Sequence, residues 1–424
     1  MSEVRPNPPL KSSSQNSQNR TADVVVVGGG IAGKACALGL AQLGLHTIEI
    51  APDLGQNAPS PQGAQWGQRI YAFSPSTQKL LNHLQIWDAL DHSRLQPVRD
   101  MRIYGDRGEK NDHLHLSAFE AGTPQLAWIG ESNLIEHTID QASRFQNKLE
   151  RIGDAVEKIE VDTEGSTLHL KNSGSIRAQL VIAADGAQSP IRGELGIGVS
   201  EESYSQSAVV ANWLCTYPHL ETAFQWFLPG GDILAMLPLP GKQVSMVWST
   251  SPEHAADLLK LDQAQWLDQF SSIANGAITK QLGELTLNST PTAFPLRKIR
   301  AKRFIAPENH PKVVLIGDAA HVMHPLAGQG LNLGLRDVAV LLNILGKRES
   351  FRSPSDLVLL RRYERQRQGD TSALLWVTDK LKKLFSANSN TERQLRNWGL
   401  GLVNRNHFIK QRLIERALGE IDFE

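Results

Sequence analysis

Residues 23–33 read Asp-Val-Val-Val-Val-Gly-Gly-Gly-Ile-Ala-Gly, and this stretch decides the fold. Its apolar, β-branched run, Val24–Val27, is typical of a parallel strand that is buried on both faces. Gly28, Gly30 and Gly33 then follow with the spacing G-x-G-x-x-G. This spacing predicts a tight turn, a backbone that a diphosphate can approach, and a helix packed closely on the strand. The stretch therefore predicts a dinucleotide-binding unit.

The sequence after the motif supports the same unit, with one departure. Small apolar residues predict a helix that ends at Gly44, and its N-terminus favours an anion. A second strand is predicted at Thr47–Ile50. The acid that commonly closes this strand and holds the adenosine ribose is replaced by Ala51. Glu49 and Asp53 flank this position, so either carboxylate, or backbone and water, are the alternatives for that contact.

Length and composition exclude several classes of protein. A chain of 424 residues predicts two or three structural units, and 44 basic residues balance 44 acidic ones, which gives no charge for binding nucleic acid. The two cysteines, Cys36 and Cys215, form no C-x-x-C pair, which argues against a redox dithiol or a zinc site and favours a reducing compartment. Residues 1–20 are rich in Ser, Asn, Gln and Pro and predict a disordered tail rather than a secretory signal. No apolar run of 18 residues occurs, so we expect a cytoplasmic protein.

Strand patterns predict an α/β fold in which a Rossmann-like dinucleotide-binding domain is interrupted by an antiparallel sheet. Closely spaced strands in 206–250 indicate hairpins, whereas the run Val313–Ile316 resembles Val24–Val27 and belongs to the parallel sheet. Large apolar residues of the hairpins are candidates for a wall that faces a substrate, although most residues of this kind are expected to be plain core: Trp213, Phe224, Trp226, Phe227, Met236 and Trp248. The predicted division is a tail at 1–20, a dinucleotide-binding domain at 21–200 and 290–346, an antiparallel-sheet domain at 201–289, and C-terminal helices at 347–424. Helices are predicted at Ser76–Leu90, Ser132–Gln146, Ala255–Ile273 and Leu331–Gly346.

Two further motifs follow apolar strands. Asp185-Gly186 closes the strand 180–184 and is followed by Ser189 and Arg192, while Gly317-Asp318 closes the run 313–316. The second motif continues through His321 and His324 to Gly328-Gln-Gly330 and the helix that begins at Leu331. The two histidines lack a further Cys, His or carboxylate cluster, so no metal site is predicted.

Together with the opening motif, these stretches resemble the class A flavin-dependent aromatic hydroxylases, the para-hydroxybenzoate hydroxylase class. Within that class the chain is most similar to the ubiquinone-biosynthesis hydroxylases, over about residues 22–419. The stretch 317–337 is the most specific part of the resemblance. Shorter stretches that also match are Ser203–Gln206, Pro218-His219, Phe294–Leu296 and Tyr363–Arg367.

The resemblance implies an FAD-dependent monooxygenase that hydroxylates the ring of a polyprenylated phenol in ubiquinone biosynthesis, with NAD(P)H and O2. It implies that Asp318 accepts a hydrogen bond from an FAD ribityl hydroxyl, and that Arg69 lies near the diphosphate. Asp185-Gly186 would serve FAD and the nicotinamide donor. No catalytic side chain is assigned, and Glu131 matches a family acid of unassigned role. The implied cofactor-binding residues are Gly28, Gly30, Gly33, Arg69, Asp185, Gly186, Asp318, Gly328, Gly330, Leu331 and Asn332.

Three alternatives remain open at this point. The chain could act on another aromatic, as a salicylate-type hydroxylase does, or serve as a flavin reductase or epoxidase of prenyl lipids, or be a non-catalytic assembly subunit of a quinone-synthesis complex. The stretch 391–419 is basic and amphipathic. It predicts helices that pack on the FAD domain or, alternatively, a peripheral contact with the anionic inner membrane or with other ubiquinone-synthesis proteins.

Overall fold

A computed structural model describes residues 20–52, 54, 66–105, 113–323 and 329–386, with the backbone alone for 274, 329 and 373–386. Several predictions lie outside this part of the chain. They are the disordered tail up to residue 19, the sites at Asp53, His324 and Gly328, and the basic stretch 391–419. Within the described ranges, no helix combines the length and apolar character needed to cross a bilayer.

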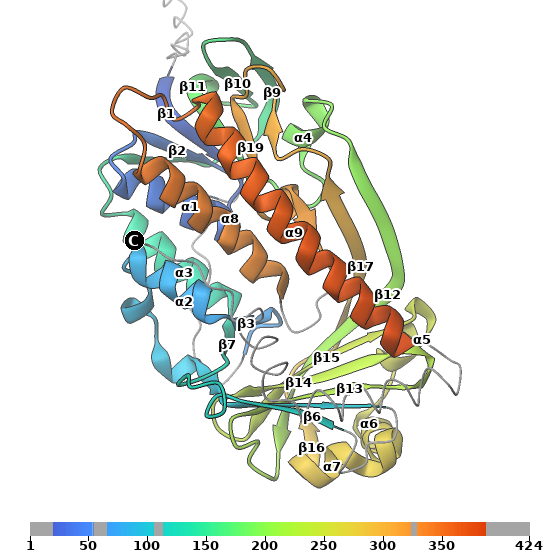
Figure 1. The fold of residues 1–424 in the computed structure, drawn as a ribbon. Coiled ribbons are helices and arrows are strands. Elements are labelled where there is room, and N and C mark those ends of the chain that lie inside the picture. The colour runs from blue at the N-terminus through green and yellow to red at the C-terminus, as the bar shows by residue number, and fades with distance from the viewer. Residues whose placement is uncertain (1–19, 53, 55–65, 106–112, 324–328, 387–424) are drawn as a thin grey trace, which may run out of the picture.

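The first sheet contains the predicted parallel strands, ordered β18-β19-β11-β1-β2-β8, with β10 and β9 added beside β11 (Figure 1). Val27 on β1 pairs with Ala183 on β11, and Ala183 pairs with Leu315 on β19. The carboxyl ends of these three strands therefore meet at one edge of the sheet, where ligands bind in such folds. The strands are β1 (Arg20–Val27), β2 (Thr47–Ile50), β8 (Leu149–Ile152), β9 (Val156–Val161), β10 (Ser166–Leu170), β11 (Gly174–Ala183), β18 (Ile305–Ala306) and β19 (Val313–Leu315).

Helices cover this sheet and bring distant parts of the chain together. α1 (Ile31–Gln42) packs on both α3 (Ser132–Ser143) and α8 (Gln329–Gly346), and α9 (Leu357–Ser386) packs alongside α8 (Figure 1). The buried residues of α1 and α8 share one hydrophobic core with the strands. Because the glycine motif opens α1 and the Gly330 segment opens α8, this packing sets the two helix N-termini beside each other.

The second sheet has the order β20-β17-β12-β15-β14-β13-β5-β6, with β16 beside β12, and lies below the first sheet in Figure 1. Helices α5 (Pro252–Leu258), α6 (Gln263–Ser272) and α7 (Ala277–Leu282) share a hydrophobic core with its outer face. The strands are β5 (Asp100–Tyr104), β6 (His113–Ser117), β12 (Val199–Cys215), β13 (Thr222–Phe227), β14 (Ile233–Leu239), β15 (Gln243–Thr250), β16 (Leu285–Leu287), β17 (Thr292–Ala301) and β20 (His321–Val322).

This sheet extends beyond the predicted range 201–289. β17 and β20 lie after that range, and β5 and β6 lie far before it, with β5 running parallel to β13. Alternation of apolar residues predicts that a strand exists but carries no information about its partner, so the sequence could not assign β5 to this sheet. A small third sheet, β3 (Ile70–Phe73), β7 (Ala127–Glu131) and β4 (Gln96–Val98), shares a hydrophobic cluster with β13 and β14.

Two predicted helices are shorter than expected. The helix expected at Ala255–Ile273 is split into α5 and α6, because Asp262 and Gln265 form a capping box that starts a new helix. The helix expected at Ser76–Leu90 is α2 (Pro75–His83), which Ser74 rather than Ser76 caps, by accepting a hydrogen bond from the Thr77 N–H.

Candidate functional site

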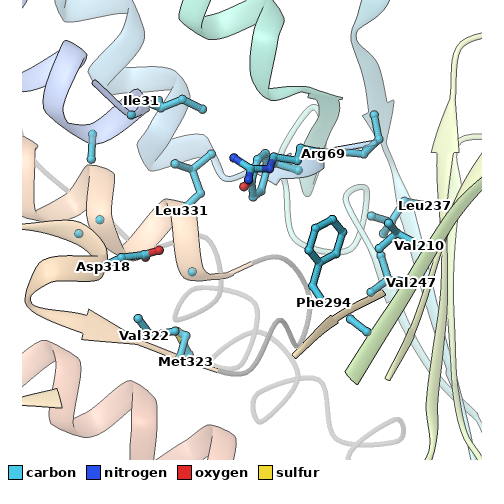
Figure 2. A pocket seen from close by; sticks show the side chains of 18 of the residues that line it. Ile31, Arg69, Val210, Leu237, Val247, Phe294, Asp318, Val322, Met323 and Leu331 are labelled. Carbon is cyan, nitrogen blue, oxygen red and sulfur yellow. The ribbon is translucent and has the colours of Figure 1, made fainter. Parts of the chain in front are cut away.

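A cavity of about 530 Å³ lies between the carboxyl edge of the first sheet and the inner face of the second. Figure 2 shows its two sides. Asp318 and Leu331 belong to one side, and Val210, Val247 and Phe294 project from the strands of the other. The cavity therefore joins the predicted cofactor motifs to the predicted substrate sheet.

The glycine motif forms the entrance of α1, and its three glycines have different roles. Gly28 has φ +128°, and a Cβ added to it would lie 2.1 Å from the carbonyl oxygen of Ala184. A Cβ on Gly33 would lie 2.1 Å from the carbonyl oxygen of Gly28. Gly30 lines the cavity, and a Cβ on it would meet nothing within 4 Å. Gly28 and Gly33 are thus required by the protein's own backbone, whereas Gly30 keeps a space open at the helix N-terminus, which fits a diphosphate.

Arg69 lies just before β3 and lines the cavity, and Glu131 holds the segment before it in place. The Glu131 carboxylate accepts hydrogen bonds from the Gly67 N–H and from Arg94 Nε, the latter at 2.7 Å. The Arg94 guanidinium also lies 4.4 Å from the centroid of the Trp66 ring. Glu131 is 1% exposed, so this acid, whose role the sequence left open, positions the loop that leads to Arg69.

Asp318 follows β19 in a short 3-10 turn, Gly317–Ala319, and its side chain faces the cavity (Figure 2). The protein that surrounds it raises the pKa of its carboxyl by desolvation, while His321 and Arg69 act to lower that pKa. Tyr71 also lines the cavity, and burial raises the pKa of its phenol. A carboxylate in this position can accept a hydrogen bond from a ligand hydroxyl.

His321 is turned away from this chemistry and belongs to a buried ion-pair network. Its Nε2 lies 2.7 Å from Oδ2 of Asp337, and the same oxygen accepts a hydrogen bond from the Gly317 N–H. Oδ1 of Asp337 accepts from Arg367 Nε at 2.7 Å. Burial alone would raise the pKa of Asp337, but His321 and Arg367 outweigh it and hold that pKa below its usual value. The network therefore ties α9 to the turn that carries Asp318.

The N-terminus of α8 completes the side of the cavity that lies at the edge of the first sheet. Gly330 and Leu331 line it, and a Cβ on Gly330 would meet nothing within 4 Å. Asn332, predicted with them, does not line the cavity. Its Oδ1 accepts from the Ser74 N–H at 2.9 Å, and its Nδ2 donates to the Ala72 carbonyl at 2.7 Å. The Asn332 side chain therefore anchors α8 to the β3–α2 segment.

The Asp185-Gly186 motif is divided in the same way. Gly186 has φ +86° and lines the cavity. Oδ2 of Asp185 accepts from the Ile191 N–H, at the start of α4 (Pro190–Glu194), whereas its Oδ1 is buried with no hydrogen-bond partner among the described residues. Arg192 donates to the Ala319 carbonyl at 2.8 Å, so it links this motif to the turn of Asp318.

Of the two acids that could replace the ribose-binding acid, the structure describes Glu49, whereas Asp53 lies outside the described residues. Ala51 is 5% exposed at the end of β2. Oε2 of Glu49 accepts from Arg151 Nε at 2.8 Å, and Arg151 also pairs with Asp140, which pairs with Lys34. The Glu49 carboxylate is thus engaged in an ion-pair network, and within the described part of the chain its Oε1 is buried without a hydrogen-bond partner.

Most of the large apolar candidates for the wall are plain core, as expected for residues of this kind. Trp213, Trp226, Met236 and Trp248 lie in the core between the second sheet and α5–α7, on the opposite face of the strands from the cavity. Phe227 packs with Leu114 and Ile233, and of the six residues Phe224 alone lines the cavity. Strand alternation predicts two faces but does not tell which one meets the cofactor. The cavity face instead carries Ala208, Val210, Ala223, Gln225, Ala235, Leu237, Ser245, Val247, Phe294 and Leu296.

Comparison with known proteins identifies the class. The model of the family "FAD binding domain" matches residues 21–375, and this chain belongs to that family. The expected FAD cofactor and the expectation of an enzyme are thereby confirmed, together with the resemblance stated from the sequence.

The curated relatives give the closer resemblance. The chain is 32% identical over 403 residues to the 3-demethoxyubiquinol 3-hydroxylase of Escherichia coli K12, covering 95% of this chain and 99% of that one. It is 31% identical over 407 residues to the ubiquinone hydroxylase UbiL of Rhodospirillum rubrum, covering 96% and 91%. It is 29% identical over 450 residues to the human mitochondrial ubiquinone biosynthesis monooxygenase COQ6, covering 93% and 92%.

Solved structures confirm the fold. The p-nitrophenol 4-monooxygenase of Pseudomonas putida DLL-E4 superposes with a TM-score of 0.72 at 19% identity, covering 95% of this chain and 100% of that one. HpxO of Klebsiella pneumoniae, complexed with FAD and uric acid, superposes with a TM-score of 0.70 at 18% identity, covering 96% and 99%. The α/β fold with an FAD-binding domain and an inserted antiparallel sheet, as predicted, is the fold of FAD-dependent monooxygenases.

Proposed function

We propose that this chain is an FAD-dependent monooxygenase that hydroxylates the ring of a polyprenylated phenol in ubiquinone biosynthesis, using NAD(P)H and O2. The observation that carries the proposal is the cavity itself. Backbone glycines and Asp318 form one side of it, and an apolar sheet face forms the other. The relatives that match nearly the whole chain and are named as ubiquinone or demethoxyubiquinol hydroxylases support the choice of substrate.

We assign FAD to the side of the cavity that lies at the edge of the first sheet. Backbone N–H groups at Gly30 and the start of α1 would hold the diphosphate, with Arg69 beside it. Asp318 would accept a hydrogen bond from a ribityl hydroxyl. N–H groups at Gly330 and Leu331 would stabilise negative charge on the flavin ring. When bound, FAD supplies the activation of O2 and the transfer of one oxygen atom.

The opposite side would hold and desolvate the substrate. Small side chains on the cavity face, among them Ala208, Ala235 and Val247, leave room for a ring. Apolar walls exclude water, which protects the oxygen transfer from wasteful release of peroxide.

The test is a reaction of the purified, FAD-loaded protein with a short-chain prenylated phenol, NADH or NADPH, and 18O2. We expect a product that carries one labelled oxygen and little free peroxide. Reduced nicotinamide consumed with no labelled product from any prenylated phenol would contradict the proposed activity. A protein that binds FAD but neither consumes nicotinamide nor forms product would favour the non-catalytic assembly subunit.

We also propose that the chain collects its substrate at the periphery of the inner membrane, because a polyprenyl tail partitions into lipid. The basic residues of 391–419 support this, since each gains about 1 kcal/mol near anionic lipid. Co-sedimentation with anionic vesicles at low salt should then exceed that of a variant with Lys410, Arg412 and Arg416 changed to Gln. Equal pelleting of the two proteins, or none, would contradict it and point to delivery by a partner protein.

A further inference from the structure

The cavity face of the second sheet carries a polar side chain that lacks a partner. Gln225 lies on β13 and is 5% exposed. It lines the cavity, and none of the described residues forms a hydrogen bond with its carboxamide. Its two polar atoms are not among those that are fully enclosed without a partner, so they open on the cavity, where an amide needs water or a ligand for its hydrogen bonds. Its partner is therefore expected to come from the cavity.

Strand pairing places Gln225 in a row of small apolar residues. Gln225 pairs with Ala235 on β14, Ala235 pairs with Val247 on β15, and Val247 pairs with Val210 on β12. All four residues line the cavity. A prenylated ring laid along this row would meet apolar side chains along most of the row and one carboxamide at its β13 end.

The carboxamide offers both an acceptor, Oε1, and two donors on Nε2. It can accept from a ring hydroxyl or donate to a ring ether or carbonyl oxygen. When a ring displaces water from the cavity, an oxygen substituent would replace the water at Gln225. A ring without one would leave the amide unpaired, and sites of this kind reject such analogues strongly.

We infer that Gln225 is a specificity-determining residue that hydrogen-bonds an oxygen substituent of the aromatic substrate and thereby sets the orientation of the ring. The inference rests on the proposed function, because it takes the cavity to be the site of an oxygenated ring. Ser245 is the natural comparison on the same face. It is 2% exposed, lines the cavity and lies one row away, opposite Leu237.

The test uses binding alone, measured as the flavin difference spectrum of the FAD-loaded protein titrated with two probes. The probes are 2-allylphenol and allylbenzene, which differ by the ring hydroxyl. Gln225→Met keeps the length of the side chain and removes its hydrogen bonds. We expect it to weaken 2-allylphenol about threefold to tenfold, the usual worth of one hydrogen bond, and to leave allylbenzene unchanged or slightly tighter. Retained flavin absorbance and an unchanged melting temperature would show that the variant is folded.

Ser245→Ala is the matched control and should affect the phenol less than Gln225→Met does. The inference is overturned if Gln225→Met weakens both probes equally, or weakens neither. It is also overturned if Ser245→Ala alone produces the phenol-specific loss, or if the wild-type protein binds 2-allylphenol no more tightly than allylbenzene. Because the titration needs no turnover, it can succeed where the 18O2 experiment fails, and the reverse, so the two proposals fail separately.

Discussion

The two sides of the cavity are built by different means. On the cofactor side the backbone forms the surface, and glycines are placed where a Cβ would strike the chain, as at Gly33, or fill the cavity, as at Gly30. On the sheet side, side chains of ordinary type from β12 to β15 form the surface through their shared face. A backbone surface tolerates almost no change, whereas a side-chain surface can be reshaped. With FAD and substrate placed as proposed, the fold would thus combine a fixed cofactor site with an adjustable substrate site.

The sharpest break of this comparison is Gly33→Val. The new Cβ would lie 2.1 Å from the carbonyl oxygen of Gly28, so α1 must separate from β1. We expect a loss of more than about 4 kcal/mol in the free energy of unfolding, measured by urea denaturation of the apoprotein. Gly30→Val is the matched control. It should cost about 1 kcal/mol as a poor N-cap and keep the fold, yet bind no FAD. Equal stability of the two variants would contradict the different roles given to these glycines.

The next largest effect concerns the ion pairs behind the cofactor side. Asp337→Ala leaves Arg367, which is 1% exposed, with a buried charge and no partner on α8. We expect a loss of about 3–5 kcal/mol in unfolding free energy at neutral pH. Asp370 also pairs with Arg367 but is 55% exposed, so Asp370→Ala should cost less than about 1 kcal/mol.

The pH dependence gives an independent check. The pKa of Asp337 is held below its usual value in the folded protein, so its stabilisation is complete above the unfolded value of about 3.9. That stabilisation is lost as the pH falls through the folded pKa. The difference between wild type and Asp337→Ala should therefore shrink below about pH 4, and a difference that grows on acidification would rule out this assignment.

The contrast between the backbone side and the side-chain side of the cavity also decides how much of the site could be predicted from the sequence. The motifs at Gly28, Asp185 and Asp318 were predicted because backbone approach to a cofactor demands particular residues at fixed spacing. The residues of the sheet wall could not be chosen from the sequence, because Trp226 and Gln225 differ by one position in a strand, and alternation does not tell which face meets the cofactor. The signal that could have found the wall is the set of small residues on the same strand face as Gln225. Choosing that face requires knowledge of how the strands pair.

Asp318→Ala sharpens the comparison, because Asp318 is a side chain on the backbone-built side. Loss of a charge-assisted hydrogen bond to a ribityl hydroxyl should weaken FAD by about 1.5–3 kcal/mol, measured by fluorescence titration of the apoprotein. Desolvation raises the pKa of Asp318, so its ionised form opposes folding. The apoprotein of the variant should therefore gain stability relative to wild type as the pH rises through that raised pKa. Unchanged FAD affinity would remove Asp318 from the site.

The smallest effect on the cofactor, and the clearest on the substrate, is expected from two neighbouring residues on β14. Ala235 faces the cavity and Met236 faces the core behind the sheet. Ala235→Leu should fill part of the substrate space and raise KM for a prenylated phenol, while FAD affinity stays within about 0.5 kcal/mol of wild type. Met236→Leu conserves volume, so it should cost less than about 1.5 kcal/mol in stability and leave KM unchanged. Steady-state kinetics of both variants with saturating FAD would measure this. If Met236→Leu changed KM as much as Ala235→Leu, the face of the strand would not decide contact with the substrate, and the adjustable side of the cavity would have to be sought elsewhere.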